Sequence, residues 1–72
     1  MSDLINIQKR FGQRMRALRV AKGLSQEEFA ANCGLDRTYI SGVERGKRNI
    51  SLKNIEVVAQ SLGVKISEFF EE

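Results

Sequence analysis

The sequence predicts an all-α, compact domain of five helices, and three observations indicate this class. The chain has 72 residues, enough for one small domain over 1–72 and for no second one. It contains no proline. Four glycines stand where helices of ordinary length would need a left-handed residue at their ends, namely Gly23, Gly34, Gly46 and Gly63.

The first helix is predicted over about 6–22 from the spacing of its apolar residues, with a start anywhere between Asp3 and Asn6. These recur every three or four positions, as one face of a helix requires: Leu4, Ile7, Phe11, Met15 and Leu18. The remaining positions include Lys9, Arg10, Arg16 and Lys22, which lie away from the stripe.

The next three helices are predicted over 26–33, 37–45 and 52–62 from capping signals. Ser25 precedes the second helix, and Glu28 completes a capping box with it. Asp36 and Ser51 are N-cap candidates for the third and fourth. An apolar residue before each cap pairs with one inside the helix as a hydrophobic staple: Leu24 with Phe29, Leu35 with Ile40, Ile50 with Ile55. Ser67 is expected to cap a final short helix over 68–71.

The charge balance favours a polyanionic partner. Lys and Arg number 12 against 9 Asp and Glu, for a net charge of +3. Residues 1–50 hold ten basic and five acidic side chains, net +5, whereas residues 51–72 hold two and four, net −2. Seven of the cations are arginine, the side chain best suited to phosphate and base-edge recognition. A solvated basic face would give the same balance, so this evidence leaves both interpretations open.

Several function classes are disfavoured by what the chain lacks. Without histidine and with a single cysteine, it offers no zinc ligand set, no internal disulfide and no histidine base. Cys33 is expected to be a packing residue rather than a nucleophile. No apolar run approaches the roughly 20 residues of a membrane span. We therefore expect a cytoplasmic protein that is not an enzyme and has no metal, cofactor, small-molecule ligand or membrane partner.

The second and third helices resemble a helix-turn-helix over about 26–45. Only three residues separate them, and Ala30, Gly34 and Ile40 allow close approach, a tight turn and a filled interface. Any helical hairpin could carry these residues, but together with the caps they favour the DNA-binding form. On a helical wheel Ile40 and Val43 face inward. The residues on the opposite side are Thr38, Ser41, Gly42 and Arg45, with Arg37 at the N-terminal end.

This arrangement predicts which side chains contact DNA. Arg37, Thr38, Ser41 and Arg45 are expected to read base edges in the major groove. Contacts to phosphate are predicted for Gln26, Tyr39, Lys47, Arg48 and Asn49. Gly42 has two interpretations, close approach to the duplex or a tolerated glycine. Arg19 and Glu44 lie at the edges of the buried sides of their helices and are predicted to form a structural ion pair.

These motifs resemble the phage-repressor and Cro-like helix-turn-helix family, also called the Xre type. The matching segments are RVAKGLSQEEFA at 19–30 and ERGKRN at 44–49, and the resemblance covers about 11–70. It implies a lambda-repressor-like fold and a homodimer that binds a palindromic double-stranded DNA operator. The segment DRTYISGVERG at 36–46 is similar to controller proteins of restriction–modification systems, which regulate their own genes. Many phage repressors carry a longer polar residue at the position of Gly42.

The resemblance also makes RNA polymerase a candidate partner through Glu27 and Glu28, although two surface glutamates are more often only solubilising. An antitoxin or general repressor is the alternative, with the acidic residues Glu68, Glu71 and Glu72 binding a protein partner.

Dimerisation is predicted in the segment from about 51 to 72. A chain this short, without a disulfide or a metal, commonly gains stability by association. Leu52, Ile55, Ala59 and Leu62 form the expected inward stripe of the fourth helix. The candidate interface residues are those left over, Val57, Val64, Ile66, Phe69 and Phe70. Alternatively, Ile66 and Phe69 close the core of the single chain.

Overall fold

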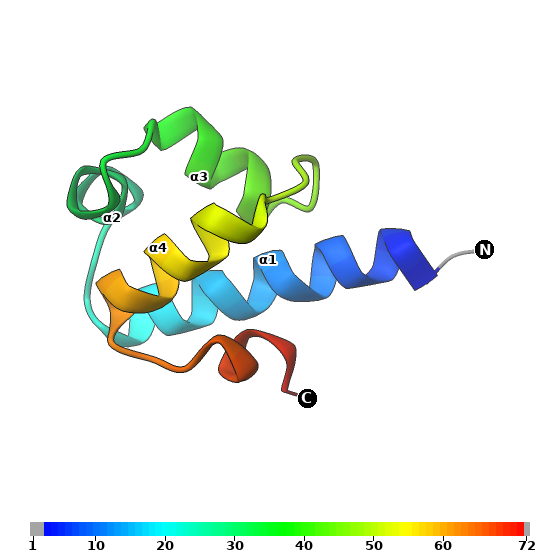
Figure 1. Ribbon diagram of the computed structural model, residues 1–72. Coiled ribbons are helices and arrows are strands. Elements are labelled where there is room, and N and C mark those ends of the chain that lie inside the picture. Colours follow the sequence, from blue (N-terminus) through cyan, green and yellow to red (C-terminus); the bar gives the residue numbers. More distant parts are fainter. Residues whose placement is uncertain (1–2, 72) are drawn as a thin grey trace.

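The computed structural model describes residues 3–71, with side chains from residue 7 onward. Four α-helices, α1 (Asp3–Ala21), α2 (Gln26–Cys33), α3 (Arg37–Glu44) and α4 (Leu52–Leu62), precede a 3₁₀ helix, η1 (Ile66–Phe70). The all-helical class is confirmed (Figure 1). The predicted bounds of α2 and α4 match, and α3 ends one residue early. Helix α1 begins at Asp3, the earliest start that the sequence allowed, and ends one residue before its predicted end.

The capping signals explain why most bounds were predictable. The Ser25 hydroxyl accepts a hydrogen bond from the Glu28 N–H at 3.0 Å, and the Glu28 carboxylate accepts one from the Ser25 N–H at 2.9 Å. Ser51 accepts a hydrogen bond from the Asn54 N–H at 3.1 Å. Asp36 occupies the N-cap position of α3, but its side chain makes no capping hydrogen bond, so that part of the prediction is wrong.

The fifth element differs from its prediction in type and start. It is a 3₁₀ helix that begins at Ile66, and Ser67 lies inside it rather than capping it. Lys65 is the N-cap residue, and its backbone N–H donates to the Glu68 carboxylate at 3.1 Å.

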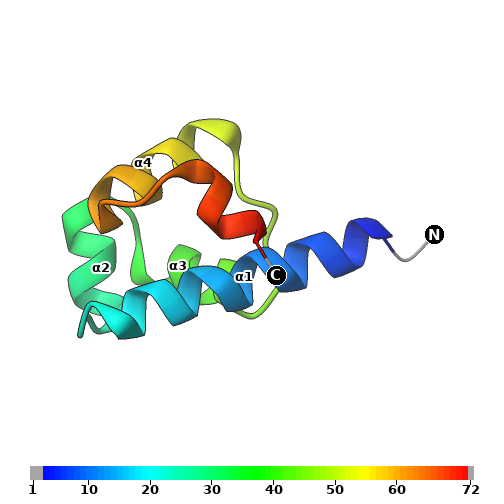
Figure 2. The same ribbon diagram turned by 90° about the horizontal axis from the view of Figure 1, so that it is seen from below.

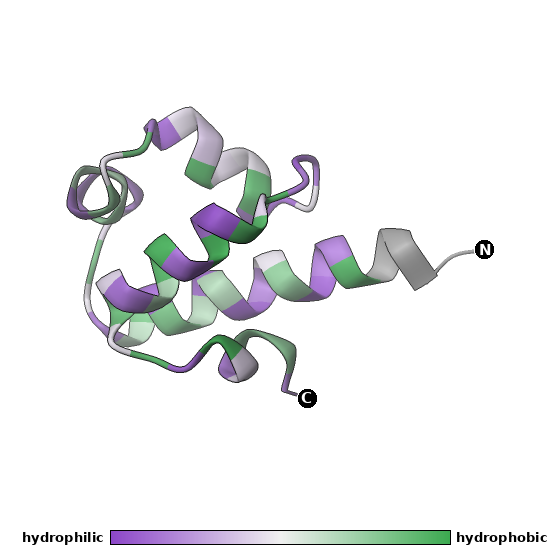
Figure 3. Cartoon of the chain, viewed as in Figure 1, coloured by the Kyte–Doolittle hydropathy of each residue, from purple (hydrophilic) through white to green (hydrophobic). Residues whose placement is uncertain are grey.

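The helices surround one core, and α1, α2, α3, α4 and η1 all contribute buried side chains to it. Figure 1 shows α2 end-on while α3 lies side-on, so the two helices of the pair cross steeply, and α4 passes in front of α1. Figure 3 shows hydrophobic residues on the side of α3 that faces this interior, whereas the outer side is near neutral to weakly hydrophilic, with strongly hydrophilic colour at the N-terminal end. The buried apolar residues are Phe11, Met15, Phe29, Ala30, Ile40, Val43, Val58, Ala59, Leu62 and Phe69. The side chain of Leu4, which the sequence predicts to be part of the apolar stripe of α1, lies outside the described side chains.

The inward face of α4 corrects the predicted stripe at its N-terminal end and adds Val58 to it. Leu52 is 86% exposed because α4 starts at the surface, so its first residue does not reach the core. Val58 is fully buried, beside Ala59 and Leu62. Val57 is half-buried on the side of α4 that carries Asn54, and Asn54 contacts Tyr39 of α3. Val57 is therefore only partly outward-facing, and its place in a dimer interface stays a prediction.

Candidate nucleic-acid interface

The turn between α2 and α3 fixes the angle at which α3 is presented. Gly34 has a left-handed backbone with φ of 68°, and its N–H bonds the carbonyls of Ala30 and Ala31 at the end of α2. The next N–H, of Leu35, donates to the Ala30 carbonyl at 2.9 Å. A side chain at Gly34 would strain this turn because left-handed backbone disfavours a Cβ atom.

Helix α3 has one buried side and one open side. Ile40 and Val43 are no more than 1% exposed, and they attach the helix to the core. Three of the four predicted base readers, Arg37, Thr38 and Arg45, are exposed, and Ser41 is half-buried. Arg45 Nε donates to the Ser41 carbonyl at 3.3 Å, so Arg45 folds back along the C-terminal end of its helix. The open side therefore carries two arginines and a threonine on a helix short enough to enter a major groove.

Arg19 and Glu44 form a buried ion pair that joins α1 to α3. Arg19 Nε and Nη2 donate to the two Glu44 carboxylate oxygens at 2.7 and 2.9 Å, a two-point contact. The side chains are 8% and 2% exposed. Arg19 Nη1 also donates to the Leu24 carbonyl at 2.7 Å. The hydrogen bond with Glu44 raises the pKa of Arg19 above its ordinary value, although burial opposes this.

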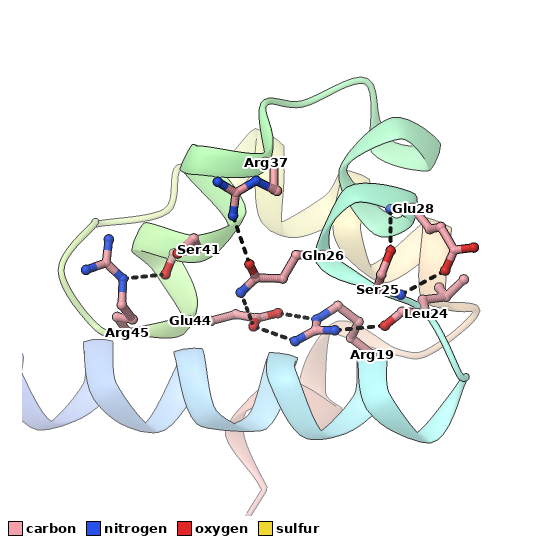
Figure 4. Close-up of polar contacts among 9 residues, drawn as sticks. All are labelled: Arg19, Leu24, Ser25, Gln26, Glu28, Arg37, Ser41, Glu44 and Arg45. Atoms are coloured by element: carbon pink, nitrogen blue, oxygen red, sulfur yellow. Dashed lines mark hydrogen bonds and ion pairs between the residues drawn. The ribbon is translucent and has the colours of Figure 1, made fainter.

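Gln26 connects this buried pair to the open side of α3 (Figure 4). Its Nε2 donates to Glu44 Oε1 at 3.1 Å, and its Oε1 accepts from Arg37 Nη1 at 3.4 Å. The Glu44 carboxylate can only accept, so it holds the amide nitrogen of Gln26 inward and the amide oxygen toward Arg37. The Gln26 side chain, predicted to contact phosphate, is thus engaged within the protein, and Arg37 is held at the first turn of α3.

The loop after α3 carries three exposed polar side chains, Lys47, Arg48 and Asn49. The N–H groups of Lys47 and Arg48 both donate to the Gly42 carbonyl, at 2.9 and 3.1 Å, which curls the loop back over α3. The Arg48 guanidinium lies 4.9 Å from the centre of the Tyr39 ring. The Tyr39 hydroxyl accepts from Asn54 Nδ2 at 3.0 Å, so its own hydrogen remains available to a phosphate oxygen.

Gly42 corrects the helical-wheel prediction. The wheel placed it on the open side with the base readers, but Gly42 is buried beneath the loop. A Cβ atom at this position would lie 3.3 Å from Arg48 Cβ. The close approach that a glycine permits here is therefore made by the chain's own loop.

Gly12 and Asn54 were not predicted, although both hold the interface in place. A Cβ on Gly12 would lie 2.8 Å from the Glu44 carbonyl oxygen and closer still to that of Val43, so α1 and the end of α3 touch through this glycine. A glycine inside an amphipathic helix costs about 1 kcal/mol relative to alanine, and that conflict was the available signal. Asn54 gave no signal in the sequence.

The predicted dimer residues do not all reach the surface. Phe69 is 1% exposed and its ring lies 4.8 Å from that of Phe11, so it belongs to the core, and its assignment to an interface is wrong. Val64 is half-buried against the core. Ile66 and Phe70 are each 46% exposed. Phe70 borders a cleft of about 220 Å³ whose other apolar lining includes Ile7, Ile50 and Ile55.

Other chemistries have little support in the described chain. Within residues 3–71 no three His, Cys, Asp or Glu side chains gather as metal ligands would. In the same range no helix is both long and apolar enough to cross a membrane. Cys33 is half-buried at the end of α2, and burial raises the pKa of its thiol, which disfavours the nucleophilic thiolate.

Comparisons with known proteins agree with this geometry. The helix-turn-helix family model matches residues 15–69. The control protein C.MunI of a Mycoplasma species is 50% identical over 68 residues, which are 93% of this chain and 92% of the relative. The control protein C.BamHI of Bacillus amyloliquefaciens is 48% identical over 67 residues, 92% and 83% of the two chains. The crystal structure of the restriction–modification controller protein C.AhdI from Aeromonas hydrophila superimposes with a TM-score of 0.85 at 56% identity, covering 88% and 96%.

The fold, the open side of α3 and these matches define a helix-turn-helix regulator of transcription. The chain belongs to the helix-turn-helix family, as the sequence motifs predicted, and it is homologous to the control proteins of restriction–modification systems.

Proposed function

We propose that this protein is the controller of a restriction–modification system and acts in the cytoplasm as a non-enzymatic homodimer on a palindromic operator near its own gene. The observation that carries the proposal is the open side of α3, which is fixed on the scaffold by the buried Arg19–Glu44 pair. Identities near 50% to two control proteins, over nearly the whole of both chains, support the particular system.

Base recognition falls to Arg37 and Thr38 at the start of α3, with Ser41 and Arg45 farther along. Arg37 suits the O6 and N7 acceptors of guanine, and the Thr38 methyl suits that of thymine. Gln26 assists by orienting Arg37 through the 3.4 Å contact. The exposed side chains of Lys47, Arg48 and Asn49, together with the Tyr39 hydroxyl, supply the phosphate contacts. The N–H groups of Gln26 and Glu27, at the start of α2, have no partner within the helix and suit a further phosphate, whereas that of Glu28 is bonded to the Ser25 hydroxyl.

The homodimer is assigned to the C-terminal segment, with Phe70 and Ile66 as its contact residues. Both are half-exposed apolar side chains, and Phe70 adjoins the apolar cleft. Two-fold association there would present two α3 helices to half-sites about one helical turn apart on one side of the duplex.

RNA polymerase is the partner proposed for activation, through Glu27 on α2. Glu27 is exposed, whereas the Glu28 carboxylate accepts the Ser25 N–H. A Glu27→Gln variant that binds the operator normally yet fails to activate a reporter would support this role, and unchanged activation would reject it.

The experiment that tests the whole proposal is a gel shift with DNA from upstream of the gene and unrelated DNA of equal length. We expect two chains per site and a preference for the upstream DNA of at least about a thousandfold, typical of specific regulators. Both affinities should fall steeply as salt rises because phosphate contacts release counterions. Equal affinity for the two DNAs, or one chain per site, would reject the proposal.

A further inference from the structure

Arg14, on α1, holds the C-terminal segment at two points. Its Nε donates to the Glu68 carbonyl at 2.7 Å, and its Nη2 lies 3.6 Å from Glu71 Oε1. These two contacts fall immediately before and immediately after the pair Phe69 and Phe70. Figure 2 shows this segment running beside α1.

Phe11 holds the same segment from one turn earlier on α1. Its ring lies 4.8 Å from the Phe69 ring and 5.6 Å from the Phe70 ring. Because Phe11 and Arg14 are three residues apart, they share a side of the helix. Phe69 is buried by this arrangement, whereas Phe70 stays 46% exposed.

The direction of Phe70 therefore depends on α1 rather than on its own helix. Five residues of 3₁₀ helix have too few internal hydrogen bonds to keep their shape alone. Phe11 restrains the rings of Phe69 and Phe70. Arg14 adds one contact on either side of this pair, at Glu68 and at Glu71, and Phe70 faces the cleft lined by Ile7, Ile50 and Ile55.

We propose that Arg14 is a positioning residue for dimerisation, which holds Phe70 in the direction that a second copy of the chain contacts. This inference rests on the homodimer of the proposed function. The hydrogen bond and the ion pair of Arg14 both go to the C-terminal segment rather than to the α2–α3 pair. Its loss should weaken the dimer and leave DNA recognition by each single chain intact.

The size of the effect follows from the symmetry of the dimer. If only a fraction of free chains holds the segment correctly, the dissociation constant rises by the inverse of that fraction for each chain. Both chains must be ordered, so the fraction enters squared. A charge-assisted hydrogen bond is strong enough that its loss lowers the ordered fraction to about a third, which gives a rise of about tenfold.

Sedimentation equilibrium of the full chain tests this. We expect Arg14→Ala to raise the dimer dissociation constant about tenfold. Arg14→Lys keeps the charge but not the planar guanidinium, and it should give a smaller rise. Glu71→Gln removes only the exposed ion pair and should have less than about a twofold effect. The matched control is Arg16→Ala, an exposed arginine on the same helix, which should dimerise as the wild type does.

Binding to a duplex that carries one half-site separates positioning from simple unfolding. We expect Arg14→Ala to bind the half-site as the wild type does while binding the full operator more weakly at low protein concentration. If Arg14→Ala also loses half-site binding, binding to the half-site and to the full operator is compared for Arg14→Lys instead.

Phe70→Ala distinguishes failure of this inference from failure of the proposed function. If Phe70→Ala dissociates the dimer but both Arg14 variants dimerise normally, the role of Arg14 is rejected and the dimer surface stands. If Phe70→Ala also dimerises normally, the C-terminal surface itself is rejected, and the role of Arg14 is rejected with it.

Discussion

The Arg19–Glu44 pair offers the sharpest test of how α3 is held, through the variant Glu44→Ala. The change removes two acceptors at 2.7 and 2.9 Å from an arginine whose side chain is 8% exposed. It also removes the acceptor of Gln26. Arg19 would keep only the Leu24 carbonyl, which cannot neutralise its charge. Stranding one member of a buried ion pair typically costs about 3–5 kcal/mol.

We expect a cost near 3 kcal/mol, because Arg19 sits close enough to the surface to turn partly toward water. For a domain of this size each kcal/mol lowers the melting temperature by roughly 4–8 °C, so a fall on the order of 12–24 °C should follow. Circular dichroism without DNA measures it, with Glu56→Ala, an exposed glutamate on α4, as the control. A melting temperature for Glu44→Ala within error of the control would refute the reasoning.

Three further predictions concern recognition, packing and thiol reactivity. Arg37→Ala should lose about 1–3 kcal/mol of discrimination at one base pair per half-site, whereas Lys47→Ala should lower the affinity for all DNA sequences alike and reduce its salt dependence. Binding titrations on operator and random DNA measure both effects. An equal loss of affinity for the two DNAs in Arg37→Ala would contradict base reading. Gly12→Ala should destabilise by about 1–3 kcal/mol in chemical denaturation, because its methyl meets backbone carbonyls that cannot move away; unchanged stability would contradict the close contact. Because burial raises the pKa of Cys33, its alkylation rate should reach half-maximum at a higher pH than that of an unfolded control peptide, and an equal or lower midpoint would contradict burial. The stability that depends on the neutral thiol should be complete below the pKa of the peptide thiol and should decline as pH rises through the raised pKa of Cys33.

Signals that act within a few residues were sufficient to predict most of the fold. The capping box at Ser25 and the left-handed Gly34 define α2 because a helix end is stabilised by groups next to it in the sequence. Tertiary contacts decided what the sequence left ambiguous. Leu52 has the right spacing for the core but lies at the exposed start of α4, and Val58, which was outside the predicted stripe, is buried.

The candidate site was predictable in its residue types but not in its internal contacts. The open side of α3 follows from helical periodicity, which placed Arg37 and Thr38 correctly as exposed residues. Periodicity could not show that the loop folds over Gly42, because that depends on hydrogen bonds to Lys47 and Arg48 beyond the helix. Nor could it show that Gln26 links Glu44 to Arg37, since those three residues meet only once the helices are packed.

Selection of bound DNA from a random pool tests most directly whether paired α3 helices read an operator. We expect an enriched palindrome whose half-sites lie about 10–10.5 base pairs apart, or a whole multiple of that, centre to centre. Each half-site should contain a guanine whose enrichment disappears when Arg37→Ala is used in the same selection. Enrichment without two-fold symmetry, or a sequence preference that Arg37→Ala leaves unchanged, would contradict the mode of recognition proposed here.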